Sequence, residues 1–422
     1  MKSLKIALAL CLSLTSLNIS LAAIPKPGTS CPKMGLTLIS NGIKYTCIKS
    51  GKILIWNKGQ KIPVVNPTIS ISPSNQSTSP TPLPTSSNSP TPTTMQSPSA
   101  IPTVSPTPTP NPLPLIELNS FQDLEKNFQE IAFFAWKKSK EKIDAEKSVA
   151  MNVEILLGPN AKLNYLTPEI PISLVNRLYA GAKLPTKVVH LVFAFEDRDW
   201  AMAKMDVITP NSSSSWVKDV ACPTKSTCFG GGSFFNFSTR TSLIVLANGI
   251  DPNNINNSIS GTVEAHEYAH VIEQTSSNTP RPAVNLLMHP WPPNWYWEGL
   301  AQFSQNAAVY SDSFDQYLKH REYDAGQLFS DKTWNASNIE AYFQRNLTQE
   351  WSEKYPRWRQ YDLGSMLVEI LVALRGPDIA MKMFNESING GGFDAAFQRL
   401  YGSSFESVLP LISRTIALEL GH

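Results

Sequence analysis

Apolar residues recur with two different spacings along this 422-residue chain, and the spacing changes near residue 260. Before that point, short apolar runs of strand type occur at 153–157, 188–195 and 241–247. A helical spacing of three to four residues occurs at 121–147 and in nearly all of the sequence after Ser260. Strands followed by helices predict an α+β fold for residues 116–422, with a small N-terminal sheet and a mainly helical C-terminal half.

The N-terminus has a different pattern, in which Lys2 and Lys5 precede an apolar stretch at 6–17 and small residues follow. A positive end, a short apolar middle and a small-residue cleavage site predict a secretory signal peptide over residues 1–23, cut after Ala23. The alternative is a retained membrane anchor, although the stretch is shorter than the ~20 residues that a span needs. We therefore expect a secreted or cell-surface protein.

Residues 28–62 have the pattern of a small β module. Two strand-like runs, at 36–40 and 43–48, are joined by Asn41-Gly42, a strong signal for a two-residue hairpin. So short a segment buries too little apolar surface to be stable without a covalent staple. It resembles the two-cysteine β modules of secreted bacterial proteins, and we expect a spacer or cell-surface attachment role.

Four cysteines remain once Cys11 is removed with the signal peptide, and an even number in an oxidising compartment favours two disulfides. Proximity in sequence favours Cys31–Cys47 and Cys222–Cys228 over the other two connectivities. Buried free thiols are the further alternative. Neither pair has the spacing of a cysteine zinc site.

Residues 66–115 consist mainly of Pro, Ser, Thr and Asn, with 14 of the chain's 33 prolines, no glycine and no charged residue. This composition predicts a disordered, extended linker. Over the whole chain, 36 Lys and Arg balance 34 Asp and Glu, for a net charge of +2. That balance supplies no basic surface, so we expect no nucleic-acid partner.

The residues with the clearest chemistry are HEYAH at 266–270. No proline interrupts 261–277, so a helix is expected there. His266 and His270 then lie on one helical face, one turn apart, and can share one metal ion. Glu267 projects beside that ion, where its carboxylate can take a proton from a bound water. The alternative is an ordinary helix with two surface histidines.

A catalytic zinc ion takes three protein ligands and keeps a fourth position open for water. Downstream of HEYAH, Trp295 and the run EGLA at 298–301 match the W-x-x-E-G-x-A pattern that follows HExxH in gluzincin peptidases. The chain therefore resembles the gluzincins, with their zincin-like catalytic fold. The resemblance implies that zinc is held by His266, His270 and Glu298.

Other candidates for the third ligand are weaker. The metzincin pattern would need Gly and His at positions 273 and 276, where this chain has Glu273 and Ser276, so that class is excluded. His289, in the proline- and tryptophan-rich loop before the W-x-x-E-G-x-A run, is an alternative ligand or substrate contact. Glu273 lies too close to the second histidine to reach the ion, and Asp312 lies about 20 Å along the next helix. We expect neither to take part.

A second match is YDLG at 361–364, which resembles the Y-x-x-G of aminopeptidase N-like gluzincins. The resemblance implies that the Tyr361 hydroxyl donates a hydrogen bond to the oxyanion; the alternative is a tyrosine that packs on the core. Two features depart from known branches. The segment 230–236 has no acidic residue to hold a substrate's free amine, and Gln302 stands where thermolysin-like enzymes have an aspartate.

Together these motifs predict an exported zinc metallopeptidase that acts on a peptide or protein substrate, with Glu267 as general base. The strand at 241–247, or the glycine turn at 230–232, is expected to present backbone to an extended peptide. Two other classes stay open. One is a catalytically silent zincin-fold binding or cell-surface protein, and the other is a non-peptidase zinc hydrolase of amides or esters.

Overall fold

The computed structural model describes residues 27–30, 34, 37–40, 43–51, 53–61, 118–147, 151–277, 290–347 and 356–422. They belong to two units, Met1–Ser105 and Pro106–His422, and each unit is described by itself. The predicted signal peptide (1–23) and the predicted linker (66–115) lie outside the described residues. In the described part of the chain, no helix is both long and apolar enough to cross a bilayer.

The N-terminal unit is an antiparallel sheet built around β2 (Ile43–Ser50), which pairs with three other strands. These are β1 (Thr37–Ser40), β3 (Ile53–Trp56) and β4 (Gln60–Lys61). Ser40 pairs with Ile43, so the predicted two-residue hairpin is confirmed by the register. Cys47 lies opposite Trp56 and both are buried. Cys47 is disulfide-bonded, and its predicted partner, Cys31, lies outside the described residues.

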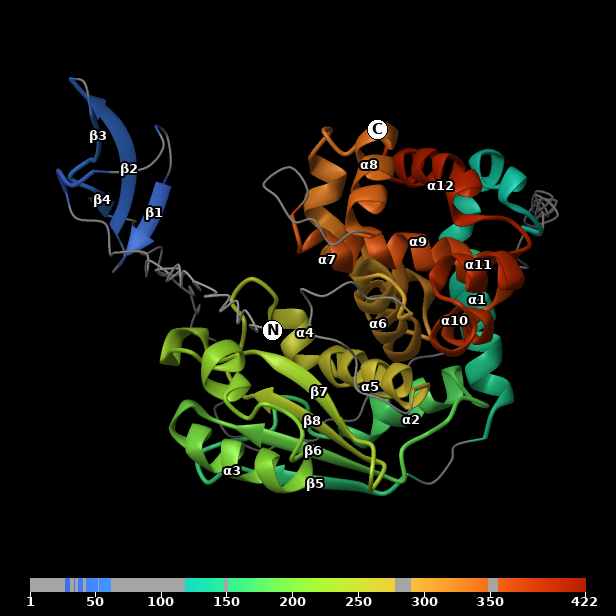
Figure 1. Ribbon diagram of the computed structural model, residues 1–422, viewed down its shortest axis with the longest axis horizontal. Coiled ribbons are helices and arrows are strands. Elements are labelled where there is room, and N and C mark those ends of the chain that lie inside the picture. Colours follow the sequence, from blue (N-terminus) through green and yellow to red (C-terminus); the bar gives the residue numbers. More distant parts are fainter. Residues whose placement is uncertain are drawn as a thin grey trace, which may run out of the picture. The chain divides into compact units, whose positions relative to one another are not determined.

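The C-terminal unit contains a four-stranded sheet in the order β5-β6-β8-β7 (Figure 1). The three predicted strands are confirmed and run parallel to one another. The fourth, β7, is an antiparallel edge strand that the apolar pattern does not predict. The bounds are β5 (Val153–Leu157), β6 (Lys187–Phe193), β7 (Gly231–Asn236) and β8 (Thr241–Ala247).

Helices are interleaved with these strands in the part of the chain before Ser260. The expected order of strands first and helices afterwards is therefore wrong there. α2 (Glu169–Leu178) lies between β5 and β6, and α3 (Arg198–Ile208) follows β6. The physical reason is that parallel neighbours cannot be joined by a tight turn and need a crossover connection. A mixed α and β fold with a small sheet is what remains of the prediction.

The mainly helical C-terminal half is confirmed. α5 (Thr262–Thr275) packs against β7 on one side and α6 (Asn294–Val309) on the other, and α6 crosses α9 (Arg359–Arg375) (Figure 1). The other helices are α1 (Ile131–Ala145), α4 (Ile255–Ile259), α7 (Phe314–Ser330), α8 (Ala336–Leu347), α10 (Pro377–Asn389), α11 (Phe393–Tyr401) and α12 (Phe405–Glu419).

The predicted disulfide Cys222–Cys228 is present and closes a short loop just ahead of β7. Beside it, the Gly230 N–H donates to the Ala221 carbonyl at 2.9 Å. A Cβ at Gly230 would come within 2.6 Å of the Ala221 backbone, so this close approach requires glycine. The loop therefore anchors the beginning of the edge strand.

Candidate metal centre

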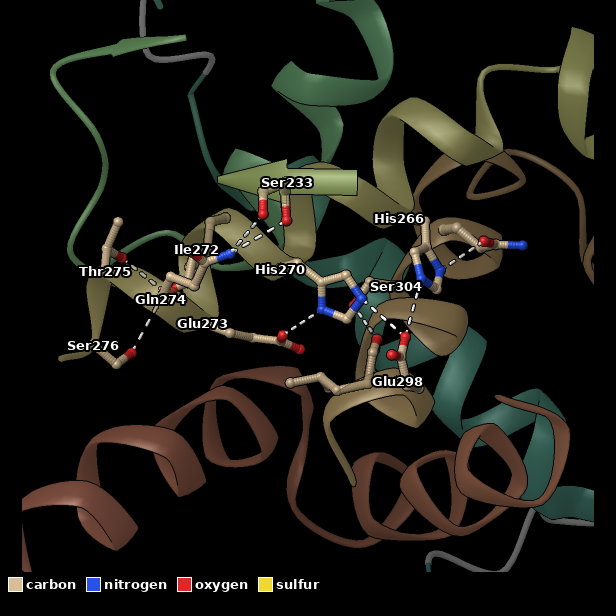
Figure 2. A network of polar contacts seen from close by, with 12 residues as sticks. Ser233, His266, His270, Ile272, Glu273, Gln274, Thr275, Ser276, Glu298 and Ser304 are labelled. Atoms are coloured by element: carbon tan, nitrogen blue, oxygen red, sulfur yellow. Dashed lines mark hydrogen bonds and ion pairs between the residues drawn. The ribbon is translucent and has the colours of Figure 1, made fainter. Parts of the chain in front are cut away.

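α5 carries the whole HEYAH segment, as predicted. Gly261 precedes the helix at φ 86°, a left-handed conformation that glycine adopts without strain. The imidazole rings of His266 and His270 lie one turn apart with centroids 4.8 Å from each other and ring planes nearly perpendicular. Both rings point toward the first turns of α6 (Figure 2).

Glu298, near the start of α6, completes this group. Its Oε2 lies 3.0 Å from His270 Nε2 and 3.5 Å from His266 Nε2, and the three ligand atoms lie within 4.8 Å of one another (Figure 2). All three side chains are largely shielded from solvent. The predicted convergence of Glu298 on the histidine pair is therefore confirmed.

The other candidates for a third ligand are placed as follows. Asp312 is 97% exposed and pairs with Lys140, so it takes no part in the group. His289 lies outside the described residues. Glu273 is not one of the three converging ligands, as expected, but it contacts His270 directly, which the sequence does not predict.

Glu273 and Gln305 orient the two imidazoles through hydrogen bonds at Nδ1, while Nε2 of each ring faces Glu298. The His270 Nδ1–H donates to Glu273 Oε2 at 2.6 Å, and the His266 Nδ1–H donates to Gln305 Oε1 at 3.1 Å. Both contacts fix the orientation of the rings so that each Nε2 faces Glu298, and with a metal ion bound they would select the tautomer whose Nε2 lone pair is free for the ion. The sequence contains a signal for each residue: Glu273 is three positions after His270, and Gln305 is seven after Glu298, so both fall on the appropriate helical face.

The aromatic ring of Trp297 packs against the flat face of the His270 imidazole. The indole of Trp297 stacks on the imidazole with a centroid separation of 4.8 Å and an interplanar angle of 16°. Because Trp297 directly precedes Glu298, the first turn of α6 supplies both the carboxylate and the ring that fixes one histidine plane. Sequence reasoning uses Trp295 of the motif and misses Trp297.

The surroundings shift the pKa values of Glu267 and Glu298 in opposite directions. Burial raises the pKa of Glu267, although the neighbouring histidines oppose the shift. Burial also acts to raise the pKa of Glu298, but His270 and His266 outweigh it and hold that pKa far below its usual range. Burial disfavours a charged His270, yet Glu273 and Glu298 raise its pKa to about 10. Glu298 is thus suited to remain anionic and Glu267 to exchange a proton.

Tyr361, on α9, lies beside the same group. Its ring is 5.9 Å from that of His266 at an interplanar angle of 29°, and it lines one cavity together with His266 and Glu267. Burial is the main cause that raises the pKa of Tyr361 well above its ordinary value. The hydroxyl of Tyr361 therefore stays protonated and can act as a hydrogen-bond donor.

No family model matches this chain, and no curated protein or solved structure matches it either. The chemistry open to the site is set by the ligand atoms of its own side chains. Two histidines with engaged Nδ1 atoms and one anionic carboxylate offer three convergent ligand atoms. This buried group could hold a metal ion.

The edge strand β7 passes directly over the general-base candidate. A Cβ at Gly231 would come within 3.0 Å of Glu267 Oε1, so the backbone of β7 approaches that carboxylate as only glycine allows. By contrast, β8 is flanked by β6 and β7 and has no free edge. Of the two segments expected to present backbone to a peptide, the strand at 241–247 is therefore wrong. The glycine turn at 230–232 instead leads into edge strand β7, whose Gly231 lies against Glu267.

The cavity beside the group has a volume of about 750 Å³, and Asp324 is one of its lining residues. Asp324 accepts hydrogen bonds from the side-chain amides of Asn257, Gln302, Gln305 and Asn306, at 2.7 to 3.3 Å. Gln302 thus contacts Asp324, while Gln305 one turn later contacts both Asp324 and His266. Gln305 connects the candidate metal group to Asp324.

Proposed function

We propose that this protein is an exported zinc-dependent metallopeptidase of the gluzincin type. The observation that carries the proposal is the convergence of Glu298 Oε2 on both histidine Nε2 atoms, with Glu267 and Tyr361 on the same cavity. Two histidines and one glutamate are a ligand set of catalytic zinc sites, which keep one position for water. Zinc supplies Lewis-acid polarisation and acidifies water when bound to such a set.

Glu267 accepts the proton of the attacking water and returns it to the leaving amine. Its raised pKa suits both transfers, because a general base works best when its pKa approaches the working pH. Tyr361 donates its hydroxyl hydrogen to the oxyanion that develops on the attacked carbonyl. A donor of this kind contributes about 3 kcal/mol of transition-state stabilisation.

The substrate proposed for this site is an extended peptide. β7 has one side paired with β8, and its other side faces away from the sheet, so its backbone N–H and C=O groups can pair with a peptide. Gly231 places that backbone against Glu267. A peptide lying along β7 would therefore bring a backbone carbonyl toward the general base.

Export is part of the proposal. The disulfide Cys222–Cys228 is compatible with an oxidising, extracytoplasmic compartment. The N-terminal unit, with its disulfide-bonded Cys47, fits the same compartment and is proposed as a cell-surface attachment module.

The test uses the purified full chain loaded with one equivalent of zinc and offered a mixed peptide library. Glu267→Gln keeps the size and all three ligands, so zinc content should persist while hydrolysis falls by several orders of magnitude. The matched control is Glu141→Gln, which changes an exposed carboxylate on α1. Zinc binding with no hydrolysis by the wild type would favour the silent zincin-fold alternative, and hydrolysis of ester or small-amide probes alone would favour a non-peptidase hydrolase.

A further inference from the structure

We infer that a second, smaller cavity of this protein binds a divalent transition-metal ion, held by His190 of β6 and Glu264 in the first turn of α5. This cavity has a volume of about 30 Å³ and is separate from the one beside the candidate metal centre. The inference does not depend on the proposed peptidase activity, because neither side chain belongs to the group formed by His266, His270 and Glu298.

The first argument is that both side chains are buried without partners at the atoms that ligate metals. His190 is fully buried and Glu264 is 3% exposed. Within the part of the chain that the structure describes, the Glu264 Oε2 atom and both imidazole nitrogens of His190 have no hydrogen-bond partner. Buried polar atoms are nearly always paired, so these three atoms indicate a ligand in the cavity that both residues line.

The second argument is the distance between the two side chains. His190 Nε2 lies 4.0 Å from Glu264 Oε1, beyond the reach of a direct hydrogen bond. Two atoms that ligate one zinc ion lie about 3.4 Å apart at a tetrahedral angle and about 4.2 Å apart at most, since each bond to zinc is about 2.1 Å. One ion can therefore contact both residues after a closure of about 0.6 Å.

The third argument is charge. A water molecule in the cavity would supply hydrogen bonds but would leave the buried Glu264 carboxylate without an opposite charge, which is costly. Among the described residues, His190 is the only basic side chain within 4.0 Å of that carboxylate. A protonated His190 would itself need an acceptor at each nitrogen, and the described residues provide none. A metal ion supplies the positive charge and takes the lone pair of the neutral imidazole.

Two side-chain amides can complete the ligand set. Asn164 and Asn248 line the same cavity and are half-buried, so they also mark the side from which an ion can enter. Asn164 Nδ2 donates to the Gly249 carbonyl at 3.4 Å, so its Oδ1 stays available as a ligand. One imidazole nitrogen with carboxylate and amide oxygens suits a divalent first-row ion such as zinc, whereas calcium takes oxygen ligands alone.

An ion at this place would join segments that are distant in sequence. His190 belongs to β6, Asn248 directly follows β8, and Glu264 lies in the first turn of α5. Because His266 follows Glu264 by two residues, the ion would anchor the turn of α5 that leads into the candidate metal centre. We therefore expect a structural ion, whose removal lowers stability.

The test counts zinc in the full-length protein by elemental analysis, after saturation with zinc and removal of free metal. We expect two ions per chain in the wild type, one in His190→Leu, one in His270→Ala and none in the double variant. His320→Leu, which changes a histidine on α7, is the control and should keep two. Zinc should raise the melting temperature of His270→Ala but not that of the double variant, and calcium should not replace zinc in His270→Ala.

A second variant keeps the test decisive if His190→Leu does not fold. Asn248→Ala changes a half-buried amide and should weaken binding of the second ion by about 10-fold or more. A wild type with one zinc ion, and with none left in His270→Ala, overturns the inference and means that the cavity holds water. Undiminished binding of the second ion in Asn248→Ala and in His190→Leu also overturns it, and so does binding of calcium at this cavity.

The proposed function is judged separately, by hydrolysis of peptides. Loss of one ion in His190→Leu together with no hydrolysis by the wild type would overturn only the peptidase. Hydrolysis by a wild type that binds a single zinc ion would overturn only the second ion.

Discussion

Gly299 and Gly364 meet where α6 crosses α9. A Cβ on Gly299 would lie 2.3 Å from the Gly364 carbonyl carbon, and a Cβ on Gly364 would lie 2.1 Å from the Trp295 oxygen. Gly299 directly follows Glu298, and Gly364 is one turn after Tyr361. The glycines of the two sequence motifs therefore share one structural cause, which is the close helix crossing that brings the carboxylate and the tyrosine to one site.

Replacing Gly364 by alanine should separate the helices and affect both stability and the site. We expect a loss of about 1–3 kcal/mol in the free energy of unfolding, because the added methyl group meets backbone that cannot move aside. Zinc affinity should fall as Glu298 shifts. Urea unfolding measures the first effect. The control is Gly326→Ala on α7, where a Cβ meets nothing within 4 Å, and it should be neutral or stabilising. Equal stabilities for the two variants would contradict the close-crossing argument.

Removing the Glu298 carboxylate should weaken zinc binding by about 10-fold or more and abolish hydrolysis, because the ion would lose one of three ligands. Competition with a chromophoric chelator measures the affinity. Asp312→Ala is the control, since that carboxylate is exposed and distant from the group. If Glu298→Ala kept normal affinity and His289→Ala lost it, the site would contain three histidines.

Glu273→Ala should reduce zinc affinity by about 10- to 100-fold, the usual effect of losing a residue that orients a ligating histidine. Glu273→Gln should recover part of that loss, because its amide oxygen can still accept from His270 Nδ1. The rescue separates orientation from general destabilisation, which thermal unfolding of both variants would report. An affinity for zinc that is unchanged in Glu273→Ala would restore the simpler expectation from sequence.

His190 should make the fold sensitive to acid. It is fully buried in β6, and burial lowers the pKa of His190 to about 4. Below its ordinary pKa of 6.5 the histidine gains a proton more readily in the unfolded chain, so stability is complete above about pH 6.5 and is lost as the pH falls toward 4.

The non-titrating variant His190→Gln should lack this dependence. Between pH 7 and pH 4 the free energy of unfolding of the wild type should fall by about 3 kcal/mol relative to the variant. Urea unfolding at several pH values in the presence of a chelator measures the difference. The nearby Glu264, whose Oε1 lies 4.0 Å from His190 Nε2, is present in both proteins. Parallel pH profiles would show that His190 does not contribute.

Helical spacing places His266, Glu267 and His270 on one face of a helix, and the resemblance to gluzincin motifs implies that Glu298 and Tyr361 join them. The sequence does not predict β7, because its segment begins with two glycines, which have low strand propensity. Its strand conformation comes from pairing with β8, a contact between parts of the chain that no local pattern encodes.

Contacts between helices set a similar limit. The sequence shows that Gln305 shares a face with Glu298, but not that this face meets His266. The sequence predicts only that Glu273 lies too near to His270 to reach an ion. That same nearness lets it hold the other side of the ring.

The residues that orient the ligands lie on the same two helices as the ligands themselves. α5 contributes His266, Glu267, His270 and Glu273, and α6 contributes Trp297, Glu298 and Gln305, so one pair of neighbouring helices holds the binding group together with its supports. The centre is therefore portable: a designed helical hairpin that reproduces the contact between α5 and α6 would transplant a supported three-ligand site into an unrelated scaffold. What such a graft would lack is Tyr361 and the edge strand, so it would separate metal binding from turnover in a molecule small enough to synthesise.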